Sequence, residues 1–253
     1  MAWQKKHKKK SPALFRFIRF LAWVIFPKFT TEGTENLPDE AVIFVGNHSK
    51  ANGPVFSQLY TPRECYTWTI SSMMNKKKVP DYAYTDFWSK KPKCIRWIYR
   101  LTSYIIGPIA AYVMTNADTI AVYHDKRVLN TFKESVEMME EGTDIFVFPE
   151  CYDEHNNIVH DFQRGFIDVA RVDFKKTKRS TPFVPVYICP ELKRAVFGKP
   201  IYYNNENDAK EEKERVANVL MDAISEIAYS LPEHRVVQYN NIRKRHCPKN
   251  TRQ

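Results

Sequence analysis

Cysteine is scarce in this chain, and its placement excludes a disulfide scaffold. The five cysteines among 253 residues are scattered, odd in number and form no C-x-x-C pair. A reducing, cytoplasmic setting is therefore favoured over a secreted one. The chain also lacks an internal repeat, a low-complexity block and a linker between domains. Its length fits one large domain, or a smaller domain with an appendage, and can bury a substantial core.

A clean membrane-spanning run and a signal peptide are also missing. Residues 14–26 are rich in aromatic and aliphatic side chains, but they are fewer than the ~20 apolar residues that span a bilayer and include Arg16 and Arg19. No small-residue cleavage site follows. Behind the lysine-rich residues 5–10, this run is typical of an amphipathic helix at a membrane interface. Packing of the helix on the protein's own core is the alternative.

The charge balance predicts an anionic partner. The net charge is +10 and the pI about 9.3, which suits nucleic acid, an anionic membrane or a phosphorylated metabolite. An aromatic-rich stretch, residues 81–88, lies between the lysine clusters at 76–78 and 90–93. Its rings could stack on the bases of single-stranded nucleic acid. The stretch could equally contact a membrane interface or be an ordinary solvated surface. Because no helix-turn-helix, zinc-finger or RNA-binding signature accompanies it, nucleic acid ranks last.

A histidine follows an unbroken apolar run of the chain. Residues 41–46 are the kind of unbroken apolar run that forms a buried parallel strand, and Asn47-His48 comes directly after it. Residues 52–54, Asn-Gly-Pro, indicate a helix start, whose free N–H groups favour negative charge. His48 thus lies where open α/β sheets bind ligands. An ordinary capped turn with a hydrogen-bonded histidine is the other interpretation.

The remaining pattern predicts an α/β fold, with a mostly parallel twisted sheet flanked by helices, an N-terminal amphipathic helix and a long C-terminal helix. We expect a basic tail and membrane-facing helix over residues 1–30, an α/β domain over 31–240 and a basic mobile tail over 241–253. The apolar residues 95–114 are interrupted by Gly107-Pro108, which predicts a buried or membrane-dipping helix pair. A polar loop is expected after Glu150 as far as Asp161. Predicted strands cover 66–70, 119–123, 144–148, 183–188 and 194–201, and the final helix covers 208–229.

The order of the motifs is more specific than any one of them. Asn47-His48 follows a strand, a later strand ends in Phe148-Pro149-Glu150, and Val184-Pro185-Val186 comes after that. In this order, over roughly residues 14 to 205, the sequence resembles the PlsC-type glycerolipid acyltransferases. The sequence departs from that family's pattern at Gly53, where the family has an aspartate, and at Cys151, where it has a glycine.

The resemblance implies an acyltransferase-like domain that moves a fatty acyl group to a hydroxyl. Acyl-CoA or acyl carrier protein would be the donor and co-substrate, and a lysophospholipid or polyol phosphate such as glycerol phosphate the acceptor. No metal and no further cofactor is implied. The partners would be these substrates and an anionic membrane surface, with no nucleic acid, and the protein would sit on the cytoplasmic face of the membrane as a peripheral or monotopic protein.

Roles for single residues follow from the same resemblance. His48 would be the general base, and the helix start at Gly53 would stabilise developing negative charge. The expected substrate-binding residues are Asn47, His124, Arg127, Phe148, Pro149, Glu150, Arg164 and Gly165.

Gly53 cannot orient the imidazole as the family's aspartate does. A carboxylate from Glu150, Asp153 or Glu154 would have to replace it. The alternative is a degenerate homologue that binds lipid without acyl transfer. A thiol nucleophile or zinc site at Cys151, His155 and His160 is a further, weaker possibility, because the ligand set is incomplete.

Overall fold

A computed structural model describes residues 12–85, 92–239 and 244–252. The lysine-rich residues 5–10 lie outside the described residues. Lys90 and Lys91, in the second lysine cluster beside the predicted aromatic stretch, also lie outside them. In the described part of the chain, an eight-stranded sheet has the strand order β1-β9-β8-β2-β5-β3-β4, with β10 paired to β8. All pairs are parallel except β8 with β9 and β8 with β10, so the predicted mostly parallel sheet is confirmed.

The strands of this sheet are β1 Thr30–Glu32, β2 Ile43–Gly46, β3 Cys65–Ile70, β4 Thr119–Val122, β5 Asp144–Val147, β8 Pro182–Cys189, β9 Arg194–Phe197 and β10 Ile201–Tyr202.

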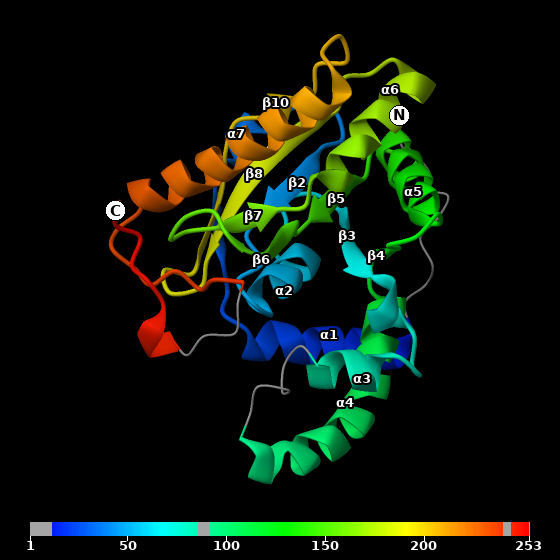
Figure 1. Ribbon diagram of the computed structural model, residues 1–253, viewed down its shortest axis with the longest axis vertical. Coiled ribbons are helices and arrows are strands. Elements are labelled where there is room, and N and C mark those ends of the chain that lie inside the picture. The colour runs from blue at the N-terminus through cyan, green and yellow to red at the C-terminus, as the bar shows by residue number, and fades with distance from the viewer. Residues whose placement is uncertain (1–11, 86–91, 240–243, 253) are drawn as a thin grey trace.

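Helices cover both faces of this sheet (Figure 1). Alternate residues of β2 enter different clusters, with Ile43 and Val45 on one side and Val42 and Phe44 flanking them on the other. The first face is covered by α5 Val128–Glu140, α6 Asp168–Thr177 and α7 Ala209–Ser230, and the second by α2 Asn52–Leu59. Because β2, β5 and β8 are covered on both faces, they consist of fully buried residues, as their apolar runs predict.

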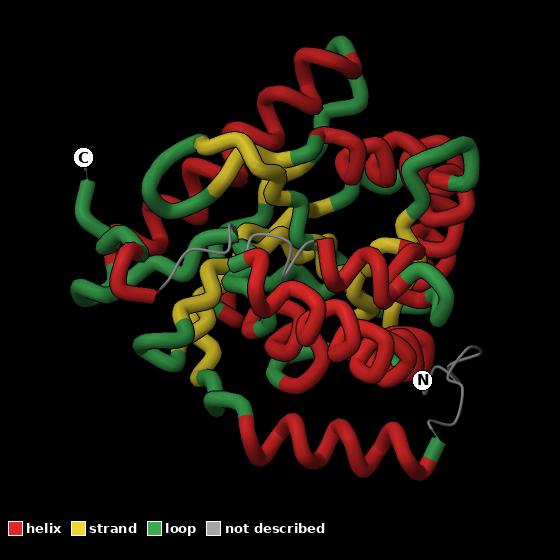
Figure 2. Tube along the Cα trace, turned by 60° about the horizontal axis from the view of Figure 1, so that its bottom comes forward, coloured by secondary structure: helices red, strands yellow, loops and turns green. Residues whose placement is uncertain are grey.

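Three further helices lie beside the sheet rather than on it. Helix α1 Ala13–Ile25 runs along the lower edge of the molecule in Figure 2 and contacts α4 Arg96–Asn116, which α3 Val79–Ala83 packs against. No helix in the described residues is both long and apolar enough to cross a membrane. Short 3-10 helices complete the structure at η1 Thr34–Asn36, η2 Ser71–Met74, η4 Lys93–Ile95, η5 Arg164–Ile167 and η6 Lys244–His246.

The predicted break at Gly107-Pro108 is wrong. Helix α4 continues through both residues as one 21-residue helix with Pro108 in its interior. A Cβ at position 107 would lie 2.9 Å from Cγ of Pro80 in α3. The glycine therefore serves close packing of two helices, and the proline costs the helix a hydrogen bond without ending it.

The predicted polar loop after Glu150 is a β-hairpin. Strand β6 Glu150–Glu154 pairs antiparallel with β7 His160–Phe162. The turn between them closes because the Asn156 side-chain oxygen accepts the N–H groups of Ile158 and Val159, at 2.8 and 3.0 Å. Such local side-chain bonds are set by turn geometry and leave no period-two pattern in the sequence.

The described part of the predicted mobile tail packs on the domain instead of extending from it. Arg235 and Lys249 form an isolated antiparallel bridge. Asn250 is buried, and its side chain donates to the carbonyl of Ala228 at 2.7 Å and accepts the N–H of His234 at 2.8 Å. A basic composition alone had suggested a solvated tail, but one buried asparagine ties residues 244–252 to the end of α7.

Candidate active site

His48 lies just beyond the carboxyl end of β2, in the middle of the sheet. The chain then turns sharply, because Ser49 and Lys50 both have positive φ values, 44° and 56°. Two consecutive non-glycine residues in this region are uncommon and store strain, a feature that clusters at functional sites. The hydroxyl of Ser49 is buried and has no hydrogen-bond partner in the described structure.

The His48 ring is enclosed by aromatic side chains rather than by a carboxylate. Phe148 and Tyr239 each place a ring centroid 5.5 Å from the imidazole. Atom Nδ1 is buried and no described residue forms a hydrogen bond with it. Burial lowers the pKa of His48, opposed only in part by the backbone of Lys50 and of His48 itself. The imidazole is therefore neutral at neutral pH, the form in which a general base works.

At the start of α2, the N–H groups of Asn52, Gly53 and Val55 are engaged by backbone carbonyls, and the anion-stabilising role expected of this helix start stays a prediction. Gly53 N–H donates to the carbonyl of His48 at 3.2 Å, Asn52 N–H to that of Ser49 at 3.1 Å, and Val55 N–H to that of Ala51 at 3.1 Å. Pro54 has no N–H. The left-handed turn at residues 49–50 places these carbonyls beneath the first turn of α2. They accept hydrogen bonds from backbone N–H groups that would have no partner in an isolated helix.

Glu150 reaches His48 through the backbone and not through the ring. One carboxylate oxygen accepts the His48 N–H at 2.5 Å, and the other accepts the His160 N–H at 3.1 Å. Burial raises the pKa of Glu150 to about 7, against the lowering effect of these two hydrogen bonds. Glu150 thus ties the end of β2 to the β6–β7 hairpin, and it does not replace the missing aspartate as a partner of Nδ1.

The contacts of Asn47, Phe148 and Pro149 position the strand ends around His48. The Asn47 side chain donates to the carbonyl of Ile188 at 3.1 Å and accepts its N–H at 2.7 Å, which extends the pairing of β2 and β8 by one step. Phe148 stacks on Phe146 at 4.7 Å and faces His48. The carbonyl of Pro149 accepts the N–H of Gln163 at 2.9 Å. All three contacts position the strand ends; the predicted role of these residues in binding substrate stays a prediction.

The structure does not bring His124 and Arg127 next to His48. Both follow β4, the edge strand, which lies three strand positions from β2, or about 14 Å at ordinary strand spacing. Arg127 is exposed and forms a forked ion pair with Asp125, at 2.7 Å for the closest contact, which lowers the pKa of that carboxyl to about 2. Its guanidinium also lies 4.4 Å from the ring centre of Tyr123.

Arg164 and Gly165 lie in η5, just beyond the hairpin. The Arg164 guanidinium donates to Asp161 at 2.6 Å, to Glu214 of α7 at 3.0 Å and to the carbonyl of Phe162. These contacts join the hairpin exit to α7. A Cβ at Gly165 would meet no atom within 4 Å, and φ is not positive there, so the structure gives no steric reason for this glycine.

The side chains of the possible thiol or zinc site go to different places. Cys151 faces Asp153 at 3.9 Å, His155 pairs with Asp222 at 3.7 Å, and His160 is buried in β7. In the described residues no three His, Cys, Asp or Glu side chains gather as a metal site would require.

Two ring side chains near His48, those of Tyr239 and His160, were not predicted to take part in acyl transfer. Tyr239 comes from the segment after α7 and packs on His48 and, at 6.1 Å, on His160. No local signal marks Tyr239, because its position depends on how residues 231–239 fold back. His160 was considered only as a metal ligand, and the unrecognised hairpin hid its place next to Glu150.

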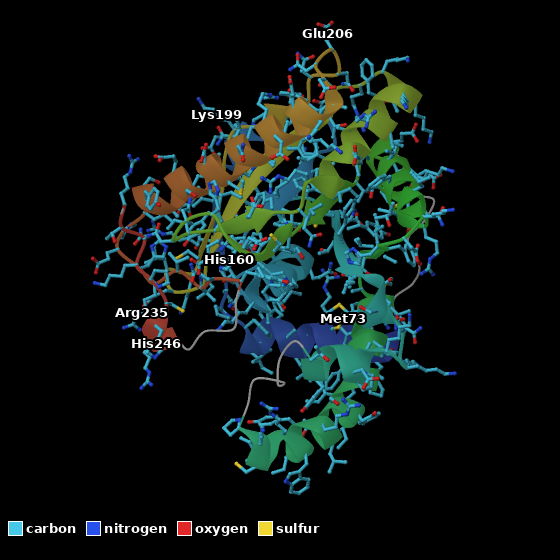
Figure 3. All side chains as sticks on the ribbon, viewed as in Figure 1. Met73, His160, Lys199, Glu206, Arg235 and His246 are labelled. Carbon is cyan, nitrogen blue, oxygen red and sulfur yellow. The ribbon has the colours of Figure 1, made fainter. Side chains whose placement is uncertain are left out.

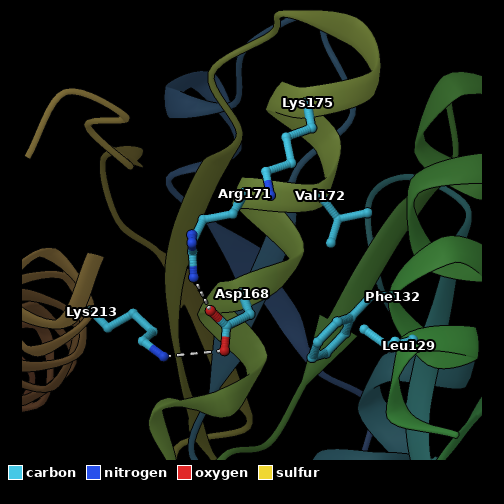
Figure 4. A pocket seen from close by; sticks show the side chains of 7 residues that line it. All are labelled: Leu129, Phe132, Asp168, Arg171, Val172, Lys175 and Lys213. Carbon is cyan, nitrogen blue, oxygen red and sulfur yellow. Dashed lines mark hydrogen bonds and ion pairs between the residues drawn. The ribbon is translucent and has the colours of Figure 1, made fainter. Parts of the chain in front are cut away.

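A separate recess lies between α5, α6 and the first turns of α7 (Figure 4). Its volume is about 280 Å³. Asp168 bonds Arg171 at 3.4 Å and Lys213 at 3.2 Å across it, so two of its three cations are already paired. The recess is lined by Leu129, Phe132, Asp168, Arg171, Val172, Lys175 and Lys213.

Comparison with known proteins identifies the family of this chain. The model of the Acyltransferase family matches residues 28–189. No curated protein sequence matches the chain. Among solved structures, the chain is similar to the 1-acyl-sn-glycerophosphate (LPA) acyltransferase PlsC from Thermotoga maritima, with 15% sequence identity, a TM-score of 0.49, and coverage of 87% of this chain and 81% of that one. The family match covers more than half of the sequence, and the chain therefore belongs to the Acyltransferase family.

Proposed function

We propose that this protein transfers a fatty acyl group from a thioester, acyl-CoA or acyl carrier protein, to a hydroxyl of a lysophospholipid or glycerol-phosphate-like acceptor. His48 is the general base. The observation that carries the proposal is the placement of His48 at the end of the central strand of an acyltransferase-family domain, with its imidazole kept neutral by burial.

The proposed reaction needs one proton acceptor and one leaving group. His48 takes the proton of the acceptor hydroxyl while the hydroxyl oxygen attacks the thioester carbonyl carbon. The tetrahedral intermediate then collapses, the C–S bond breaks, and the leaving thiolate takes the proton from the imidazolium. The products are an ester and a free thiol, and His48 returns to its neutral form.

We further propose that the reaction takes place at an anionic membrane surface, on its cytoplasmic face. Helices α1 and α4 support this, because many of their large apolar side chains are exposed, and contiguous exposed apolar patches mark interaction sites. On α1, Phe17 and Phe20 are 56% and 57% exposed; on α4, Leu101 and Ile105 are 58% and 70% exposed. Positive charge lies close by, with Lys28 positioned 3.9 Å from the Trp23 ring centre. Apolar bulk together with a net charge of +10 suits a bilayer with anionic headgroups.

A lipid-binding homologue without activity is the second candidate. The specific observation in its favour is that Gly53 replaces the expected aspartate and that no described carboxylate bonds to the His48 ring. Burial of an imidazole without such a partner makes the imidazolium costly, which slows proton transfer.

Transfer of a labelled acyl chain to lysophosphatidate or glycerol 3-phosphate separates the two. The purified protein should form the labelled ester, and His48→Ala should reduce the rate about a hundredfold or more. His155→Ala is the matched control, because His155 is an exposed histidine of the nearby hairpin and its loss should leave the rate unchanged. Equal rates for wild type and His48→Ala would overturn the assignment of His48. Lipid binding without ester formation in the wild type would favour the second candidate.

A further inference from the structure

His160 is an enclosed histidine that no structural role explains. It occupies the first position of β7, opposite Glu154, and its side chain is fully buried. Neither ring nitrogen, Nδ1 or Nε2, has a hydrogen-bond partner in the part of the chain that the structure describes. Figure 3 places it near the centre of the molecule, by the β6–β7 hairpin.

Two unpaired nitrogens in a buried ring destabilise a protein. Buried polar groups are nearly always hydrogen-bonded, and each exception calls for an explanation. An apolar side chain of similar volume would fill this position at lower cost. Within the described residues, the two nitrogens are therefore left open for a partner that these residues do not supply.

The same carboxylate and the same tyrosine connect His160 to His48. Glu150 accepts the backbone N–H of both histidines, at 3.1 Å for His160 and 2.5 Å for His48. The Tyr239 ring lies 6.1 Å from the His160 ring and 5.5 Å from the His48 ring. Both imidazoles are thus held against one tyrosine, and both carry a buried nitrogen without a described partner.

We propose that His160 is a second substrate-contacting residue, which hydrogen-bonds an oxygen of the acceptor's polar head while His48 acts on the acceptor hydroxyl. The inference rests on the proposed function. An imidazole is both donor and acceptor, and it suits an oxygen-rich group such as a polyol phosphate. The two arginines expected to hold that group are both engaged, Arg127 with Asp125 and Arg164 with Asp161 and Glu214. His160 lies next to the base instead, where the head group of a reacting acceptor has to be.

Binding without turnover tests this contact separately from catalysis. The His48→Ala protein is titrated with glycerol 3-phosphate and with a short-chain lysophosphatidate by calorimetry, with and without His160→Leu. Loss of a hydrogen bond to the head group should raise the Kd about tenfold. His155→Leu on the same hairpin is the matched control and should leave the Kd unchanged. If the His48→Ala parent binds neither probe, the proposed function fails; if it binds them and His160→Leu binds equally well, this inference alone fails.

Thermal unfolding distinguishes a substrate contact from a structural one. Because His160→Leu removes two unpaired buried nitrogens, its melting temperature should equal or exceed that of the wild type while acceptor binding falls. His160→Gln keeps a donor and an acceptor, and it should restore part of the affinity; it also serves as the test variant if the leucine variant does not fold. In steady-state assays of the otherwise wild-type enzyme, KM for the acceptor should rise and KM for the thioester should not. A fall in kcat with both KM values unchanged would overturn the head-group contact.

Discussion

The backbone N–H of Gly53 donates to the carbonyl oxygen of His48 at 3.2 Å, and a side chain at residue 53 would collide with that same oxygen. A Cβ at this position would lie 2.4 Å from the His48 oxygen and 2.8 Å from Cε1 of Phe148. The turn that places the base is therefore built around glycine. Introducing the expected aspartate at position 53 of this backbone is therefore not a local change.

We expect Gly53→Asp to destabilise the protein and not to increase acyl transfer. Overpacking of this kind costs roughly 1–3 kcal/mol, and any relief moves the His48 backbone. Gly165→Ala is the matched control for stability, because a Cβ there meets nothing within 4 Å. Denaturant unfolding of both variants and the acyl-transfer rate of Gly53→Asp provide the measurement. A faster Gly53→Asp enzyme would show that the turn relaxes and that the carboxylate reaches the ring.

Glu150→Gln should affect both the pH dependence of stability and the reaction. Burial raises the pKa of Glu150 from 4.5 to about 7, so the folded protein holds this proton more tightly than the unfolded chain does. The resulting stabilisation is fully present below about pH 4.5 and is lost as the pH rises towards 7, by roughly 3 kcal/mol at most. Glu150→Gln therefore removes the fall in unfolding free energy that Glu150 causes between about pH 4.5 and 7.

The same variant should lower kcat about tenfold or more, because an amide offers one acceptor oxygen to the two N–H groups of His48 and His160. Glu154→Gln, an exposed carboxylate of the same hairpin, is the control for both readouts. An unfolding profile of Glu150→Gln that matches the wild type at every pH would contradict the assignment of the slope to Glu150.

The fold was predictable where the pattern is local, and much of the site was not. Apolar runs identify β2, β5 and β8, and the adjacency of β2 and β5 then brings Glu150 to His48. The sequence does not reveal the left-handed turn at residues 49–50, which positions backbone carbonyls to accept N–H groups at the start of α2. Gly107 and Pro108 suggested a break because the contact with Pro80 that explains the glycine is tertiary. Tyr239 is 191 positions from His48 in sequence, and only the return of the chain after α7 brings them together.

Tyr239→Ala should expose the His48 ring. Tyr239 packs edge-on against the imidazole, and removal of the phenol opens one side of the ring. The rate at which diethylpyrocarbonate modifies His48, followed by peptide mass spectrometry, should increase severalfold. Tyr202→Ala, which truncates an exposed tyrosine of β10, should leave the rate as it is. A protected His48 in Tyr239→Ala would mean that other groups cover the ring.

Charged substitutions on α1 should detach the protein from membranes without unfolding it. Phe17 and Phe20 are both more than half exposed, so their change to aspartate removes little packing in the folded protein beyond the contact of Phe20 with the Trp23 ring at 6.2 Å. If they insert into a bilayer, the double variant loses the transfer free energy of two phenyl groups and adds two negative charges beside anionic headgroups. Partitioning to vesicles that contain phosphatidylglycerol should then fall about tenfold or more.

Leu129→Asp is the matched control, because Leu129 is 56% exposed on α5, at a distance in the chain from both α1 and α4. Sedimentation of the three proteins with vesicles, alongside their melting temperatures, decides the matter. Equal loss of binding in Leu129→Asp would show that added charge alone is responsible, and undiminished binding of the α1 variant would remove this helix from the membrane contact.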